Sequence, residues 1–113
     1  MKIESYSFGK IVISGKTYTS DVIIYPNGID AAWWRKEGHL LQLTDVEKAL
    51  LAKPELLIIG TGYAGVMRVP RETIDKIAAQ GIEVKVERTS KAVEIYNASQ
   101  GARTVVAALH ITC

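Results

Sequence analysis

Leu56-Leu57-Ile58-Ile59-Gly60, near the middle of the chain, is the stretch that decides the fold class. It is apolar at every position before the closing glycine, and such a run predicts a strand that is covered on both faces. Residues 104–111 form a second apolar run, which we expect to be another central strand. Residues 82–87 alternate Ile or Val with Glu or Lys, so we expect this strand near a sheet edge.

Three further segments have helical periodicity, with apolar residues at i, i+3 and i+4. Their boundary signals are Thr44 and Glu47 in capping-box spacing with Pro54 as the stop, Pro70 in a first turn with Gly81 past the end, and Thr89 or Ser90 as a cap. Their apolar stripes are Val46, Ala49 and Leu50, then Ile74, Ile77 and Ala78, then Ala92, Val93 and Tyr96. Helices and strands therefore alternate from residue 44 onward, which predicts a mixed sheet with helices against it.

The first third of the chain has the pattern of short strands. Residues 10–13, 16–18 and 21–25 are rich in β-branched and aromatic residues, and Ser14-Gly15 and Pro26-Asn27-Gly28 are turn sequences. We expect a small antiparallel meander here, followed by a short strand or extended segment at 31–35. The whole pattern predicts one α/β domain spanning residues 1–113.

Charge and composition argue against several classes of partner. The net charge of +2 comes from 14 basic and 12 acidic residues spread along the chain, and no run of Lys or Arg exceeds two. We therefore expect no nucleic-acid partner and no anionic lipid surface. The longest apolar stretch, residues 105–109, is far below the ~20 residues that cross a bilayer, so we expect no membrane span. With Cys113 as the only cysteine and no signal-peptide pattern, the sequence predicts a cytoplasmic location.

The segment Gly60-Thr61-Gly62-Tyr63-Ala64-Gly65 follows the buried strand directly and matches G-x-G-x-x-G. In a dinucleotide-binding fold, such glycines let backbone amides reach a pyrophosphate at a helix N-terminus. An acid about 20 residues further on binds the ribose there, and Glu83 or Glu87 is near that distance.

The context of this motif differs from the dinucleotide fingerprint, because residues 66–69 intervene and Pro70 starts the helix late. This favours a loop that needs only the φ freedom of glycine, and we expect no cofactor. Another interpretation stays open, in which the loop beside a helix start holds a small anion with help from Arg68 and Arg71.

A tandem tryptophan lies in the segment 32–39. If the backbone is extended, Trp33 and Trp34 point to opposite faces, so one fills the core and the other covers a second layer, a partner or a pocket. Arg35 and His39 are candidate polar members of such a pocket. The alternative is one core tryptophan followed by an ordinary surface loop.

His110 and Cys113 close the chain, and on a strand their side chains point to opposite sides. No pair of ligands has a standard zinc spacing, so we expect no metal site. We expect a buried histidine and a small terminal thiol in place of a Cys–His nucleophile pair. No other catalytic constellation is visible, which argues against an enzyme.

Four groups of residues together resemble one known family. They are Trp34-Arg35 with Gly38-His39, Pro54-Glu55 before Leu-Leu-Ile-Ile-Gly-Thr-Gly, Thr89 with a helix that carries Tyr96-Asn97, and Ala107-Ala108-Leu109-His110. The chain resembles a small domain family of uncharacterised prokaryotic proteins that includes the human adipogenesis-associated domain-containing protein and a mitochondrial complex I assembly factor. The resemblance implies a three-layer α/β fold with a central mixed five-stranded sheet and a β-hairpin element packed on it. It implies no catalytic activity and no cofactor, and fold likeness alone does not transfer function.

The leading hypothesis is a non-catalytic binding or assembly module that holds a protein partner or self-associates. The competing hypothesis is a protein that binds a small anion or a nucleotide through the Gly60–Gly65 loop. An enzyme that uses this loop falls under the same hypothesis. The candidate contact residues are Trp33, Trp34, Arg35, His39, Gly60, Thr61, Gly62, Tyr63, Gly65 and Arg68.

Overall fold

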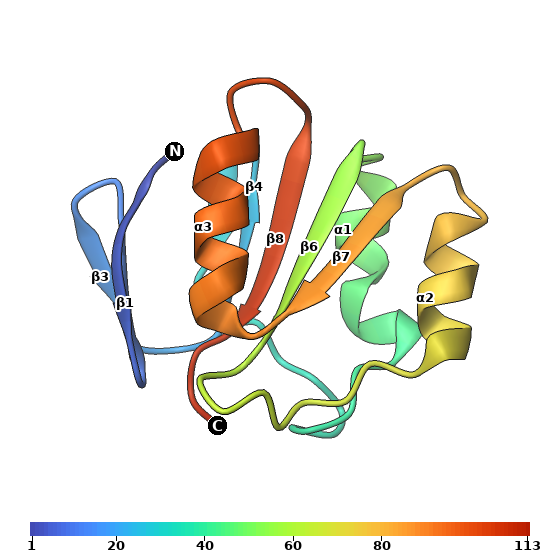
Figure 1. The fold of residues 1–113 in the computed structure, drawn as a ribbon, viewed down its shortest axis with the longest axis horizontal. Coiled ribbons are helices and arrows are strands. Elements are labelled where there is room, and N and C mark those ends of the chain that lie inside the picture. Colours follow the sequence, from blue (N-terminus) through green and yellow to red (C-terminus); the bar gives the residue numbers. More distant parts are fainter.

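The central element of the computed structural model, which describes residues 1–113, is a mixed five-stranded sheet (Figure 1). Its strands in spatial order are β5 (Gly28–Asp30), β4 (Val22–Tyr25), β8 (Val105–His110), β6 (Leu56–Thr61) and β7 (Glu83–Glu87). Strand β6 is parallel to β7 and β8, whereas β4 is antiparallel to β5 and β8. The predicted α/β class with a mixed sheet is confirmed.

The burial of the strands follows their hydrophobic patterns. Every residue of β6 and β8 is buried, as their unbroken apolar runs predict. Strand β7 lies at the sheet edge, and its charged residues Glu83, Lys85 and Glu87 are exposed while the valines between them are half-buried. Charged side chains along an edge strand discourage pairing with another chain.

A second, three-stranded antiparallel sheet lies beside the first (Figure 1). It consists of β1 (Ile3–Ser7), β2 (Lys10–Ile13) and β3 (Lys16–Tyr18). The expected strands at 10–13 and 16–18 are present, but 21–25 does not continue this meander. It contributes β4 to the main sheet, because Val22, Ile23 and Ile24 are all buried and need cover on both faces.

Helices cover both faces of the main sheet. The 3₁₀ turn η1 (Leu43–Val46), α1 (Glu47–Leu51) and α2 (Arg71–Ala78) belong to one face, and α3 (Thr89–Ser99) packs on the other between the two sheets (Figure 1). Each face has its own hydrophobic cluster, to which α3 contributes Ala92 and Tyr96, and α2 contributes Ile77. No helix has both the length and the apolar character needed to cross a bilayer.

Local helix signals were less accurate than strand patterns. The predicted capping box of Thr44 and Glu47 is wrong: the segment opens as a 3₁₀ turn whose N-cap is Gln42, two residues earlier, and the Asp45 carboxylate accepts the Gln42 amide at 2.8 Å. In α2, Thr73 is buried and Ala78 is exposed, so the stripe is rotated from the predicted one. Residues 31–35 form no strand.

The chain leaves β6 through the glycine loop and begins α2 only at Arg71, directly after Pro70. Residues 66–69 lie outside the helix, as the sequence predicts. The fingerprint of a dinucleotide-binding fold, in which the third glycine opens the helix, is therefore not formed.

The side chain of Asn97 on α3 ties the small sheet to the rest of the molecule. Its Oδ1 accepts the Ile3 amide at 3.0 Å and its Nδ2 donates to the Ile3 carbonyl at 2.8 Å. We expect Asn97→Ala to lower the free energy of unfolding by about 1–3 kcal/mol, since it leaves two backbone groups of buried Ile3 unpaired. Urea unfolding measures the loss, and Glu94→Ala on the exposed side of the same helix is the control. Equal stabilities of the two variants would contradict this role for Asn97.

Candidate functional site

The topology gathers polar residues at one edge of the main sheet. Strands β6 and β8 are parallel, and their last residues, Thr61 and His110, are register partners. Strand β4 is antiparallel to β8 and therefore starts at this edge, directly after Asp21. The chain leaves β6 toward α2 on one face and enters β8 from α3 on the other. In open α/β sheets, the carboxyl ends of strands at such a reversal are the usual place for a ligand.

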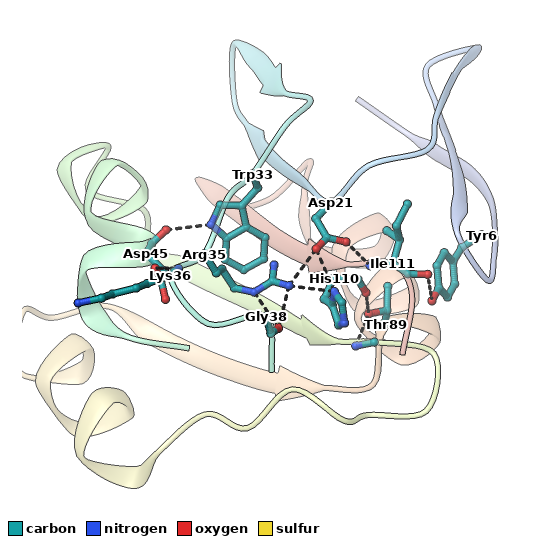
Figure 2. A network of polar contacts seen from close by, with 11 residues as sticks. Tyr6, Asp21, Trp33, Arg35, Lys36, Gly38, Asp45, Thr89, His110 and Ile111 are labelled. Carbon is teal, nitrogen blue, oxygen red and sulfur yellow. Dashed lines mark hydrogen bonds and ion pairs between the residues drawn. The ribbon is translucent and has the colours of Figure 1, made fainter. Parts of the chain in front are cut away.

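Asp21, Arg35 and His110 converge at this edge (Figure 2). Oδ2 of Asp21 lies 2.9 Å from Arg35 Nη2 and 2.9 Å from His110 Nδ1, and Oδ1 accepts the Ile111 amide at 2.8 Å. The side chains of Arg35 and His110 are 4% and 5% exposed, so the Asp21–Arg35 contact is a buried ion pair. We call these three side chains the buried triad.

Burial by itself would raise the pKa of Asp21. Hydrogen bonds from His110 and the Ile111 amide act against burial, as do the charges of His110 and Arg35, and together they hold the pKa of Asp21 below its ordinary value. Asp21 is therefore a carboxylate that only accepts hydrogen bonds at neutral pH.

Arg35 is fixed on every side but one. Its Nε and Nη2 donate to the Gly38 carbonyl at 3.2 and 2.9 Å, and its guanidinium stacks 4.6 Å from the centre of the Trp33 ring. Trp33 is itself buried, and its Nε1 donates to the Asp45 carbonyl at 2.9 Å. Nη1 of Arg35 is buried without a partner.

The two tryptophans point to opposite sides, as the sequence predicts. Trp33 is 6% exposed and packs in the core, whereas Trp34 is 75% exposed. His39 is also exposed, and its ring packs at a steep angle against the buried ring of His110, with the ring centres 5.9 Å apart. The structure thus makes Arg35 a member of the buried triad, packs Trp33 and His39 against it, and directs Trp34 away from it.

The glycine loop binds the end of this chain. The Tyr63 amide donates to the Thr112 carbonyl at 2.7 Å, and the amides of Ala64 and Val66 donate to the Cys113 carbonyl at 3.2 and 3.0 Å. These are the amides that a bound anion would use, and here they hold a backbone segment. Arg71, the other expected helper, pairs with Asp75 on the surface of α2.

Close packing explains the glycines of this loop. Gly62 has φ +110°, and an added Cβ would lie 2.3 Å from the Cys113 carbonyl carbon. At Gly60 a Cβ would lie 2.7 Å from Oγ1 of Thr89. Gly65 also has a positive φ, of +73°, and it packs on Arg88.

Thr89 connects the loop to the sheet. Its hydroxyl donates to the His110 carbonyl at 2.6 Å and accepts the Gly62 amide at 2.9 Å, so it does not act as the predicted helix cap. The Thr61 hydroxyl makes a similar bond to the Glu87 carbonyl at 3.2 Å. Tyr63 is half exposed and packs edge-on against Phe8.

The sequence interpretation missed Asp21 and the polar role of His110. His110 was expected to be buried, which is confirmed, but no partner was assigned to it. A signal was present: Asp21 precedes a buried strand, and His110 ends another. Antiparallel pairing of those strands would have placed both residues at the same edge.

A family model described as "Protein of unknown function (DUF498/DUF598)" matches residues 3–110. The chain belongs to this family. The match covers nearly the whole chain and extends from β1 to the last residue of β8, so it includes all three members of the buried triad.

Solved structures share the fold of this DUF498/DUF598 member over its full length. The conserved hypothetical protein PH1505 from Pyrococcus horikoshii OT3 is 29% identical, with complete coverage of both chains and a TM-score of 0.85. A structure named MT938 is 26% identical, covers 99% of this chain and 98% of its own, and has a TM-score of 0.83. A protein from Bartonella henselae, described as an outer membrane protein, is 24% identical over 98% of this chain and 94% of its own, with a TM-score of 0.82. At that identity the last likeness shows the fold alone.

The buried triad predicts acid sensitivity. Because the pKa of Asp21 is lower in the folded protein, its stabilising contribution is complete above the ordinary aspartate pKa and is lost as the pH falls through the folded value. We expect Asp21→Asn to lower the free energy of unfolding by about 3 kcal/mol or more at neutral pH, because the buried charge of Arg35 loses its counter-ion. On acidification, the free energy of unfolding should then fall less for this variant than for the wild type. Chemical unfolding across an acidic pH series measures both effects. Asp30→Asn, at a carboxylate that accepts only the exposed Ala32 amide, is the control, and parallel pH profiles for all three proteins would refute the assignment.

The contact of Gly62 with the end of the chain yields a second prediction. We expect Gly62→Ala to destabilise the protein by about 2 kcal/mol or more, from the positive φ and the collision with Cys113. Hydrogen exchange of the amides of Tyr63, Ala64 and Val66 should accelerate in the variant. Gly28→Ala serves as the matched control, because an added Cβ there meets nothing within 4 Å. Unchanged exchange in the Gly62 variant would show that the segment does not depend on this contact.

Proposed function

We propose that the protein is a non-catalytic binding module of the cytoplasm that holds a protein partner on the surface around α1, with Trp34 as the anchor. The exposure of Trp34 carries the proposal. A side chain of this size that is 75% exposed leaves apolar surface in water, and burying such a ring at an interface is strongly favourable.

The surface around Trp34 is hollowed and partly apolar. A cavity of about 380 Å³ lies between β4 and α1, and its lining includes Ile23, Tyr25, Trp34 and Leu51. Leu51 is 73% exposed and also borders a second cavity of about 700 Å³ between α1 and the start of β7. The two cavities share Thr44, Glu47 and Leu51, so they form one continuous face, which we call the α1 face. A concave and continuous face that combines exposed apolar side chains with polar ones has the form of a docking surface.

The charges on the α1 face favour a particular partner. Four carboxylates line it against two lysines, although the whole chain carries +2. The residues are Asp30, Asp45, Glu47 and Glu55, with Lys48 and Lys53. A segment with apolar side chains flanked by basic ones complements this face, whereas a symmetric dimer would place like charges opposite each other.

The family resemblance supports an assembly role as well. A likeness to a mitochondrial complex I assembly factor fits a module that holds another protein without chemically changing it. A single cysteine fits a reducing compartment, which supports the cytoplasm as its place of action.

The test compares three baits in an affinity capture from cell extract: the wild type, Trp34→Ala, and Tyr63→Ala as a half-exposed aromatic outside the α1 face. We expect the wild type and Tyr63→Ala to retain the same proteins. The affinity of Trp34→Ala for these proteins should be lower by about 2 kcal/mol, roughly 30-fold. Retention of the partner by the wild type should weaken with added salt.

Matching thermal unfolding curves for the three baits would show that the fold survives, as expected for a side chain that makes few contacts. Retention of the same proteins by Trp34→Ala would refute the proposed surface. A concentration-dependent dimer that Trp34→Ala abolishes, measured by sedimentation, would replace the heterologous partner with a second copy of the chain.

A further inference from the structure

A third cavity, of about 450 Å³, lies at the edge of the sheet where the buried triad is found. It is lined by Glu37, Gly38, His39, Leu40, Val66 and Arg68. Two backbone hydrogen bonds fix its walls: the Arg68 amide donates to the His39 carbonyl at 2.8 Å, and the Leu41 amide donates to the Arg68 carbonyl at 2.9 Å. None of its lining residues belongs to the α1 face.

The turn 37–40 separates this cavity from the buried triad. Gly38 lines the cavity, and its carbonyl accepts both Nε and Nη2 of Arg35 from the inner side (Figure 2). His39 lines the cavity too, and its ring packs on His110. The exposed ring of His39 is therefore the layer between the cavity and the imidazole of His110, and exposed side chains change rotamer within nanoseconds.

The surroundings of His110 decide which ring nitrogen carries the proton in the neutral form. Nδ1 lies 2.9 Å from Asp21 Oδ2 and 3.1 Å from Arg35 Nη2. Both hydrogens of Arg35 Nη2 have other acceptors, the Gly38 carbonyl and Asp21 Oδ2, each at 2.9 Å. Nδ1 therefore carries its own hydrogen and donates it to the Asp21 carboxylate, which only accepts. Nε2 then carries a lone pair, which requires a hydrogen-bond donor.

No donor in the protein reaches that lone pair. His110 Nε2 is buried and has no hydrogen-bond partner, and the whole residue is only 4% exposed. A buried polar atom without a partner is costly, and when a native site keeps one it often serves binding or chemistry. The atom that would satisfy Nε2 is an O–H or N–H donor that enters from outside.

Arg68 supplies the second half of the recognition. Its side chain is exposed and has no carboxylate within ion-pair distance, although it lines the cavity. Glu37 also lines the cavity, and its carboxylate accepts Nε2 of Gln42 at 3.0 Å. An anion at Arg68 therefore meets one attractive charge and one repulsive charge, which makes binding weak.

We propose that this cavity binds a small oxyanion that carries its own hydroxyl proton. Arg68 pairs with the anionic oxygens, His39 turns aside, and the ligand hydroxyl donates to His110 Nε2, which Asp21 holds in the accepting tautomer. The class includes hydrogen phosphate and small hydroxy acids. Binding at the carboxyl ends of β6 and β8 agrees with the general position of ligands in open α/β sheets.

The decisive experiment compares hydrogen phosphate with sulfate at slightly alkaline pH and equal ionic strength. Both are dianions of similar size, but only hydrogen phosphate carries an O–H. Titrations followed by NMR of the backbone amides near Arg68 and of the His110 ring should show phosphate binding about tenfold more tightly than sulfate, because one hydrogen bond separates them. Lactate against acetate repeats the comparison for carboxylates and shows which of the two oxyanion classes the cavity prefers.

Three variants assign the contacts. Arg68→Gln should weaken phosphate and sulfate alike by about tenfold or more, and Glu37→Gln should strengthen both. His110→Asn keeps a donor close to the Nδ1 position but lacks Nε2, so it should remove the preference for phosphate and leave sulfate binding unchanged. Trp34→Ala, on the α1 face, should change none of these affinities, which separates this site from the partner surface.

Equal affinities of the wild type for phosphate and sulfate, together with equal affinities for lactate and acetate, would overturn the proposal. So would the absence of any titration, or an Arg68→Gln variant that binds as the wild type does. The anion comparisons need only the wild-type protein, so they decide the matter even if His110→Asn does not fold.

Discussion

The Asp21 carboxylate accepts hydrogen bonds from the Arg35 guanidinium, the His110 imidazole and the Ile111 amide, which come from parts of the chain up to 90 residues apart. Those groups belong to the segment after the second tryptophan, the last residue of the central strand and the residue that follows it. One buried anion thus fixes how the strand that starts after residue 21, the central strand and the turn at 37–40 meet. The cavity beside that turn takes its shape from the same contact.

The same junction presents the proposed docking surface. Trp33 is locked inside by its bond to the Asp45 carbonyl and by the guanidinium stacked on its ring, and its neighbour therefore leaves the core on a fixed backbone. A rigidly presented aromatic side chain loses little conformational freedom when a partner covers it. The α1 face and the cavity lined by Arg68 differ in chemistry, but the same buried contacts around Arg35 hold both in place.

Local patterns predicted most of the fold, because the order of apolar and polar residues within a strand indicates whether one or both of its faces are buried. The edge position of residues 83–87 and the central position of 105–110 followed from that alone. The site was harder to predict, because Asp21 and His110 are brought together only by the pairing of strands that are far apart in the sequence. No local spacing of residues encodes that contact. The anion interpretation of the glycine loop could not be decided from local sequence either. The loop sequence permits an anion cradle, but which group occupies its amides depends on where residues 112 and 113 lie.

The order of the strands has a consequence for how the molecule is made. Strand β8 lies between β4 and β6 but follows both in the sequence, so it is synthesised after them. While a ribosome is still adding residues 105–110, the nascent polypeptide holds two hydrophobic strands whose inner edges have nothing to pair with, and such edges attract other chains. The main sheet closes only when that segment emerges and inserts between them, so the sheet cannot be completed before residues 105–110 have left the ribosome.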